Sequence, residues 1–182
     1  MSKKIIGALV GGIIIFLIQF ISWAPGEFHK SALQYTPRQD SILSYLGNQL
    51  TTEGGYYLPT SSPNATSDEK EALLKASEGK PWVQIFYHKE FKSNMLMNML
   101  RGLLTDIIVV WLFIWLISKM SNISFTGVFM SSLAVGLIVF LNSAYTGYIW
   151  FQIFDMYAYL TDAILGWGLT GVWLGWWMNR KK

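Results

Sequence analysis

Residues 5–24 read IIGALVGGIIIFLIQFISWA, and this stretch decides what kind of protein the sequence encodes. It contains no charged residue and directly follows Lys3 and Lys4. A helix that rises about 1.5 Å per residue needs about 20 apolar residues to cross the hydrocarbon core of a bilayer. Ser22-Trp23-Ala24 resembles the small-x-small cleavage site of a signal peptide, but Pro25 follows it and should hinder cleavage. We therefore expect residues 1–24 to form an uncleaved transmembrane helix.

The rest of the chain repeats this signal. Of its 182 residues, 52% are hydrophobic and 14% charged, and the mean hydropathy of +0.34 is atypical of a soluble domain. Three further apolar runs have roughly the 17–25 residues of a spanning helix, namely 95–118, 125–147 and 156–178. Residues 119–124 are a tight turn between antiparallel neighbours, and 146–155 are an aromatic link suited to the membrane interface. We predict an α-helical integral membrane protein, a four-transmembrane-helix bundle with a small α+β external domain at 25–94.

The basic residues predict how this bundle is oriented. One side of the spans is flanked by six basic and no acidic residues, which are Lys3, Lys4, Lys119, Arg180, Lys181 and Lys182. The other side, residues 25–94, carries seven basic and eight acidic residues. Because the side rich in Lys and Arg stays in the cytoplasm, we expect both termini there. The compact, cysteine-free chain is typical of a bacterial inner-membrane protein, with residues 25–94 periplasmic or extracellular.

Local signals predict the elements of the external segment. Thr36 as N-cap and Pro37 in the first turn favour a helix over about 37–50. Thr66 and Glu69 form a capping box that opens a second helix ending at Ser77 before Gly79. The aromatic and β-branched runs 56–58 and 82–87 indicate two short strands. A domain of this size has a thin core, so we expect it to depend on the membrane helices or on a partner.

Polar residues within the spans are the most informative feature for function. Five of them share a depth in the outer half of the bilayer: Gln19, Arg101, Asp106, Asn142 and Asp162. A charge at the bilayer centre costs at least about 2.5 kcal/mol, so we expect Arg101 to pair with Asp162 or Asp106. Three roles stay open: hydrogen bonds that hold the helices together while Arg101 reaches the headgroups, a cavity for a proton, cation or small ligand, or contact with a partner subunit.

Glycines on two helix faces predict close packing of backbones. They are Gly7 and Gly11 in the first span and Gly168, Gly171 and Gly175 in the last. Packing within the chain is favoured over packing against another subunit. Residues 166–171 also match GxGxxG, but no strand precedes them and they lie inside an apolar span, so we reject dinucleotide binding and expect no cofactor.

The two histidines, His29 and His88, are weak candidates for a metal site. Each has an acidic residue nearby, Glu27 and Glu90 respectively, and each lies close to a membrane boundary. Two His and two Glu can ligate a metal ion. The spacing matches no metal-binding motif, and exposed loop histidines are the commoner outcome. No catalytic motif is present, so an enzyme is the minority interpretation.

The long first external loop and the tight turn at 119–124 resemble the claudin-like four-helix architecture in topology. The paired loop cysteines of that family are absent, so the resemblance implies no residue role and no function. The thin external domain and the glycine faces favour an accessory or scaffolding subunit of a larger bacterial inner-membrane complex. Its partners would be the lipid bilayer and other membrane subunits, and no nucleic acid. The alternatives are a small-molecule or ion carrier using the polar cluster, and a metal-binding or enzymatic membrane protein.

Overall fold

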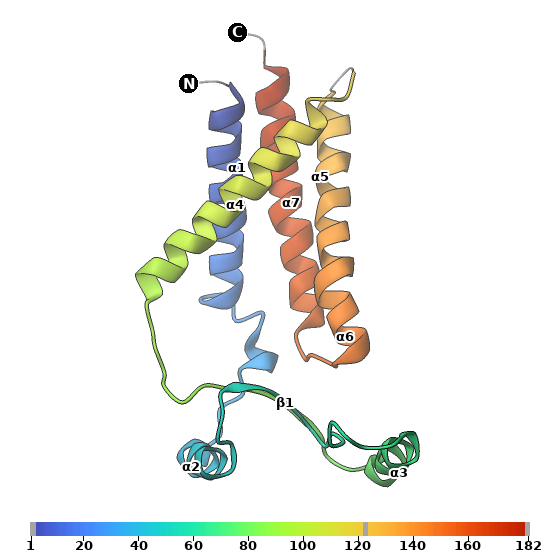
Figure 1. Ribbon diagram of the computed structural model, residues 1–182. Helices are drawn as coiled ribbons and strands as arrows, with labels where there is room; N and C mark the ends of the chain where they lie inside the picture. Colours follow the sequence, from blue (N-terminus) through green and yellow to red (C-terminus); the bar gives the residue numbers. More distant parts are fainter. Residues whose placement is uncertain (1–2, 122–123, 181–182) are drawn as a thin grey trace. The chain divides into compact units, whose positions relative to one another are not determined.

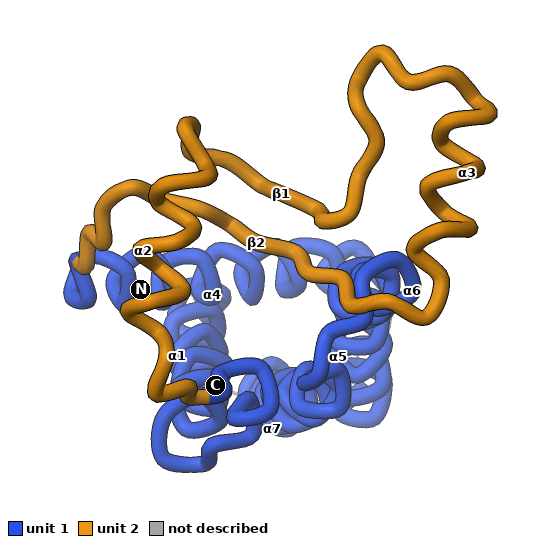
Figure 2. The backbone as a smooth tube through the Cα atoms, turned by 90° about the horizontal axis from the view of Figure 1, so that it is seen from below, with its two compact units in different colours: residues 1–34, 94–182 blue, residues 35–93 orange. Residues whose placement is uncertain are grey.

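The chain forms two compact units, coloured separately in Figure 2. The computed structural model of the protein describes residues 3–121 and 124–180, so Lys181 and Lys182 of the predicted basic flank lie outside the described residues. The helical unit comprises residues 1–34 and 94–182, and the small unit comprises residues 35–93. Each is described below by itself.

Long helices make up the helical unit (Figure 1). They are α1 (Lys3–Trp23), α4 (Met95–Ile117), α5 (Phe125–Phe140) and α7 (Met156–Asn179). A π-helical turn, η2 (Leu141–Tyr145), and a short helix, α6 (Thr146–Trp150), extend α5. Helix α7 packs against both α1 and α5, whereas α4 packs along α1 and makes few contacts with α5.

Three helices in the described part of the chain are long and apolar enough to cross a membrane: Lys3–Trp23, Met95–Ile117 and Phe125–Trp150. The last of these continues beyond the predicted end at residue 147 and takes in half of the predicted aromatic link. It does so because η2 keeps the backbone helical, with the Thr146 hydroxyl donating to the Leu141 carbonyl oxygen at 2.7 Å. Helix α7 has 24 residues, but its glycines, tryptophans and Asp162 make it less apolar, so a fourth span stays a prediction.

Small residues bring the long helices close together. A Cβ atom added at Gly12 would lie 2.6 Å from Ile107 Cα, and one at Gly136 would lie 2.8 Å from the Ala163 carbonyl oxygen. The predicted glycines lie at contacts within the chain: Gly7 and Gly11 meet α4 and α7, and Gly168, Gly171 and Gly175 meet α5. Hydroxyls cross the same contacts, since Ser132 Oγ donates to the Trp167 carbonyl oxygen at 2.6 Å. Such close approach and interhelical hydrogen bonding is how helices associate where the surroundings are apolar.

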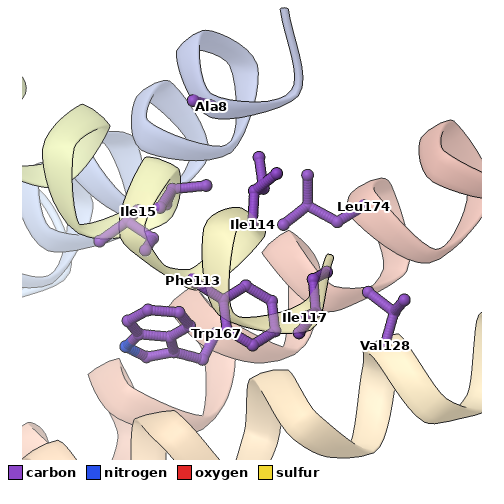
Figure 3. Packing of buried hydrophobic residues seen from close by; sticks show 9 residues of the cluster. Ala8, Ile15, Phe113, Ile114, Ile117, Val128, Trp167 and Leu174 are labelled. Atoms are coloured by element: carbon purple, nitrogen blue, oxygen red, sulfur yellow. The ribbon is translucent and has the colours of Figure 1, made fainter. Parts of the chain in front are cut away.

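The apolar core lies between these helices (Figure 3). Val110, Ile114 and Leu174 are fully buried at its centre, and Phe113 meets Trp167 edge to face at a centroid distance of 5.6 Å. No ionisable side chain belongs to this cluster of buried residues. The centre of this cluster is therefore apolar and closely packed.

Both ends of the described chain lie at the same end of the helical unit (Figure 1). Lys3 Nζ donates to the carbonyl oxygens of Met178 and Arg180 at 3.1 and 2.6 Å. Trp177 Nε1 donates back to the Lys3 carbonyl oxygen at 2.8 Å. These bonds join the start of α1 to the end of α7.

The small unit contains two helices and a two-stranded antiparallel sheet. Its elements are α2 (Gln39–Gln49), β1 (Gly54–Leu58), α3 (Ser67–Ser77) and β2 (Val83–Tyr87), with Tyr56 opposite Ile85. Helix α3 has the capping box of Thr66 and Glu69, and Gly79 after it takes a left-handed φ of 72°. Helix α2 begins two residues later than predicted, because Thr36 accepts a bond from the Arg38 N–H and closes a turn there.

This unit has no core of its own. Residues 35–93 are all described, and none of them is buried. Large apolar side chains stay exposed, among them Tyr35, Leu74, Phe86 and Phe91. A segment of this size with so little buried apolar surface is marginal in water.

Candidate functional site

A buried histidine lies just beyond the end of α1. His29 Nδ1 is 2.7 Å from Asp155 Oδ2, and His29 Nε2 is 3.1 Å from Asp162 Oδ2. The side chain of His29 is 1% exposed, that of Asp155 3% and that of Asp162 12%. The His29 cluster, as we name it, consists of Trp23, His29, Asp155, Tyr159 and Asp162. All five belong to the helical unit.

Helix α7 supplies three members of the His29 cluster from one face. Asp155 is the residue before its first turn, and Tyr159 and Asp162 follow four and seven residues later. Positions i, i+4 and i+7 lie on the same side of an α-helix. The Tyr159 ring meets the imidazole edge to face, with centroids 4.8 Å apart and planes at 72°. The spacing of the aspartates thus lets one imidazole fit between them.

A tight turn after α1 brings His29 to that face. The Gly26 N–H donates to the Ile21 carbonyl oxygen at 2.7 Å, and the Phe28 N–H donates to the Ser22 carbonyl oxygen at 3.0 Å. Glu27 takes a left-handed φ of 51° within this turn. The imidazole then stacks on the Trp23 indole, with centroids 3.9 Å apart and planes only 4° from parallel.

The short 3₁₀ helix η1 (Lys30–Ala32) holds the turn in place. Ser31 Oγ donates to the Phe154 carbonyl oxygen at 2.9 Å, which ties this segment to the residues just before α7. Lys30 Nζ lies 2.8 Å from Glu27 Oε2, and the hydrogen bond and charge of this exposed lysine lower the pKa of the Glu27 carboxyl.

The number of hydrogens on the His29 ring decides which of its two carboxylate contacts are hydrogen bonds. Both ring nitrogens of His29 face a carboxylate oxygen, and each of these contacts needs a hydrogen between its two atoms. A neutral imidazole carries one N–H and a protonated imidazole carries two. The two contacts with carboxylate oxygens therefore make the His29 cluster a candidate proton-binding site.

A cavity of about 180 Å³ adjoins the cluster between α1, α5, η2 and α7. Asp162 Oδ1 is buried and has no hydrogen-bond partner among the described residues. The cavity is lined by Ile15, Gln19 and Trp23 from α1, by Val139, Phe140, Ser143 and Ala144 from α5 and η2, and by Tyr159, Asp162, Ala163 and Trp167 from α7. We call it the Asp162 cavity. π-Helical turns such as η2 often occur at functional sites.

The structure divides the five polar residues predicted to share a depth. Gln19 and Asp162 line the Asp162 cavity. Asp106 is buried in α4 with Gln19 as its polar neighbour, and its Oδ2 atom has no hydrogen-bond partner within the described chain. Arg101 and Asn142 are exposed on α4 and η2.

The expected pairing of Arg101 with Asp162 or Asp106 is wrong. Within residues 3–121 and 124–180, no ion pair involves Arg101, and Asp162 pairs with His29 instead. The positions along the helices give comparable depths, but Arg101 lies on the exposed side of α4 while Asp106 lies on its buried side.

Among the described residues, the predicted metal ligands do not come together in one site. No group of three or more His, Asp or Glu side chains there could hold a metal. Both nitrogens of His29 contact carboxylates, Glu27 pairs with Lys30, and Glu90 pairs with Lys92 at 2.9 Å. His88 is exposed in the small unit.

The expectation that both histidines are exposed loop residues is wrong for His29. A signal for its burial was present in the sequence: Asp155 and Asp162 share a helix face with Tyr159, and no basic residue in α7 is near enough to pair with them. An acidic pair at a membrane boundary needs a cationic partner. His29, six residues beyond Trp23, is near the same predicted boundary.

Comparisons with protein families, with curated proteins and with solved structures found no match for this chain.

Proposed function

We propose that the chain is a membrane ion-binding protein in which the His29 cluster takes up and releases a proton, as the ion site of a small carrier. The observation that carries this proposal is the imidazole with a carboxylate oxygen at 2.7 Å from one nitrogen and 3.1 Å from the other. Buried ionisable groups at the edge of a membrane bundle usually serve ion or proton pathways. A histidine is the side chain whose charge changes in the physiological pH range.

The surroundings of the His29 cluster support exchange at one end of the bundle. Towards the termini, the core residues Val110, Ile114 and Leu174 are fully buried. The cluster itself lies beside the exposed turn after α1. In the topology that the basic residues predict, this end faces the outside of the cell. The proton would be taken up from there.

Histidine NMR tests the proposal. The protein is labelled with ¹⁵N at histidine and placed in lipid nanodiscs. It has two histidines, so in the variant His88→Gln only the signals of His29 remain. We expect both ring nitrogens of His29 to carry hydrogen at neutral pH, and Asp162→Asn to alter the Nε2 signal because its carboxylate acceptor is gone. A neutral ring in a single tautomer, indifferent to Asp162→Asn, contradicts the proposal.

Proton uptake into proteoliposomes loaded with a pH-sensitive dye is the functional assay. Wild-type protein and His88→Gln should admit protons, and Asp162→Asn should lose most of this uptake. Equal rates of proton uptake for the wild type and both variants would show that the His29 cluster does not carry protons.

A second candidate function, an accessory subunit of a larger bacterial inner-membrane complex, is favoured by the small unit. Its residues 35–93 have no buried member, and Phe86 and Phe91 are 74% and 96% exposed. Exposed apolar surface of this kind usually meets another protein or a membrane. Such a subunit would use the small unit to bind its partner.

Gentle extraction from the native membrane followed by native mass spectrometry tests this second function. We expect a complex with another protein, weakened by the pair Phe86→Ser and Phe91→Ser and unchanged by the exposed control Lys70→Ser. A lone monomer for the wild-type chain would rule the subunit role out.

A further inference from the structure

We propose that the start of α1 and the end of α4 together bind the headgroup of an anionic phospholipid, with its phosphate held by Lys4 and Lys119. The Lys4 site, as we name it, consists of Lys4, Trp115, Ser118 and Lys119. All four residues belong to the helical unit. The site shares no residue with the His29 cluster, so this inference is independent of the proposed function.

A hydrogen bond between two helices fixes where the charge of Lys4 lies. Helix α1 begins and α4 ends at the same end of the helical unit (Figure 1). Lys4 Nζ donates to Ser118 Oγ at 3.1 Å, and Ser118 Oγ donates to the Trp115 carbonyl oxygen at 2.8 Å. An ammonium group has three N–H donors, and this bond uses one of them. The Lys4 side chain is therefore positioned by Ser118 and can still donate to an anion.

Lys119 adds a second positive charge next to Ser118. Its Nζ atom lies 5.6 Å from the ring centroid of the exposed Trp115, which is a cation–π contact. An aromatic ring attracts an ammonium group but does not neutralise its charge. Both lysines of the Lys4 site are thus held by groups that carry no negative charge.

No acidic side chain near this end balances the two lysines. Asp and Glu are absent from every stretch of sequence that reaches it, namely residues 1–26, 107–154 and 163–182. Within the described part of the chain, neither Lys4 nor Lys119 takes part in an ion pair. Beyond the other end of α1, by contrast, Lys30 pairs with Glu27 at 2.8 Å. An anionic ligand would supply the counter-charge that the Lys4 site lacks.

The surface beside the Lys4 site favours a lipid over a small anion. Exposed apolar side chains adjoin it on both helices, and these are Ile5, Trp111, Leu112, Trp115 and Leu116. Since α1 and α4 are long and apolar enough to cross a membrane, this surface suits acyl chains. A phospholipid can place its phosphate at the lysines and its chains along these side chains. In the predicted topology this end faces the cytoplasm, where the leaflet is rich in anionic lipids.

Native mass spectrometry of the full-length protein in detergent tests the inference. The probes are palmitoyl-oleoyl phosphatidylglycerol and the phosphatidylcholine with the same chains, which share a phosphate but differ in net charge. A lysine near an anionic lipid contributes roughly a fivefold factor to binding. We expect phosphatidylglycerol to bind at least about fivefold more tightly than phosphatidylcholine, and Lys4→Gln and Lys119→Gln each to weaken its binding about fivefold. The matched control Lys30→Gln, whose charge is paired with Glu27, should bind as the wild type does.

A double variant and a competing anion complete the test. Lys4→Gln combined with Lys119→Gln should remove the preference for phosphatidylglycerol, and because both lysines are exposed the core stays unchanged. Equal binding of the two lipids to the wild type, or a loss in Lys30→Gln as large as that in Lys4→Gln, overturns the inference. Stronger displacement of the lipid by sodium phosphate than by sodium chloride of equal ionic strength would show a site for the free anion and would also overturn it.

Discussion

His29 connects the turn after α1 to the start of α7 through its contacts with Asp155 and Asp162, and the free energy of these contacts can be measured. Removing the imidazole would leave both aspartates buried without this partner. Deleting one member of a buried ion pair typically costs about 3–5 kcal/mol. We predict that His29→Ala lowers the free energy of unfolding by this amount, measured by thermal or denaturant unfolding in detergent.

The second histidine is the matched control for that experiment. His88 is exposed and outside the helical unit, so His88→Ala should change stability by less than about 0.5 kcal/mol. Equal losses for the two variants would mean that the His29 cluster contributes nothing specific.

At the scale of residues, counting along the helices brought some polar neighbours together but could not tell which way each side chain faces. Counting residues from the helix ends suggested a common depth for Gln19, Asp106 and Asp162, and two of these line one cavity while Gln19 also neighbours Asp106. The same count included Arg101, which lies on the exposed side of α4. Which face of a helix turns inward depends on its packing against neighbours, and these long helices are apolar on most sides, so periodicity gives no direction.

Glycine contacts make a testable prediction about the α1–α4 pair. A Cβ atom at Gly12 would lie 2.6 Å from Ile107 Cα, which is backbone and cannot move aside alone. Overpacking of this kind costs about 1–3 kcal/mol. We predict that Gly12→Ala destabilises the helical unit by that amount.

Gly147 provides the control for Gly12. It lies in α6, where an added Cβ atom meets nothing within 4 Å. Because glycine in a helix is less favourable than alanine by about 0.5–1 kcal/mol, Gly147→Ala should stabilise the protein slightly. If Gly12→Ala and Gly147→Ala gave the same shift in melting temperature, the close approach of α1 and α4 would be refuted.

The turn at Glu27 leads to a prediction about local backbone. Its φ of 51° lies in the left-handed region, which costs roughly 1–2 kcal/mol for most residues and more for β-branched ones. We predict that Glu27→Gly keeps or raises stability and that Glu27→Val lowers it by about 1–2 kcal/mol. Unfolding in detergent compares the two. Tolerance of valine would mean that this turn does not fix the position of His29.

At the scale of helices and strands, the features that could be predicted were those fixed by a few neighbouring residues. The capping box of Thr66 and Glu69 and the stop at Gly79 involve residues within one turn, and α3 forms where they predict it. Thr36 also looked like a cap, but it closes a turn before α2, because a threonine can serve either structure. The third apolar helix extends to Trp150, since nothing in its sequence before Phe151 marked an end and π-turns have no clear signature.

The topology of the whole molecule can be tested directly because the chain has no cysteine. We predict that Thr60→Cys reacts with a membrane-impermeant maleimide in intact cells. Ser121→Cys and Asn179→Cys should react only after the membrane is opened. This result requires an even number of spans, and therefore that α7 crosses the membrane together with the three candidate spans.

A different labelling pattern would contradict this topology. Labelling of Asn179→Cys from outside would mean that α7 does not cross, although its C-terminal end is bonded to Lys3 at the start of α1. Protection of Thr60→Cys would place the small unit in the cytoplasm and reverse the orientation inferred from the basic residues.

His29 and its partner Asp155 are 126 residues apart in the chain. During synthesis at the ribosome, α1 is complete long before α7 exists, and over that interval the imidazole has neither of its carboxylates. The site is thus completed by the last helix to emerge, and nascent chains that stop short of residue 162 lack it altogether. Quality control that senses unpaired polar groups in the membrane would have a means here of telling a finished molecule from an unfinished one.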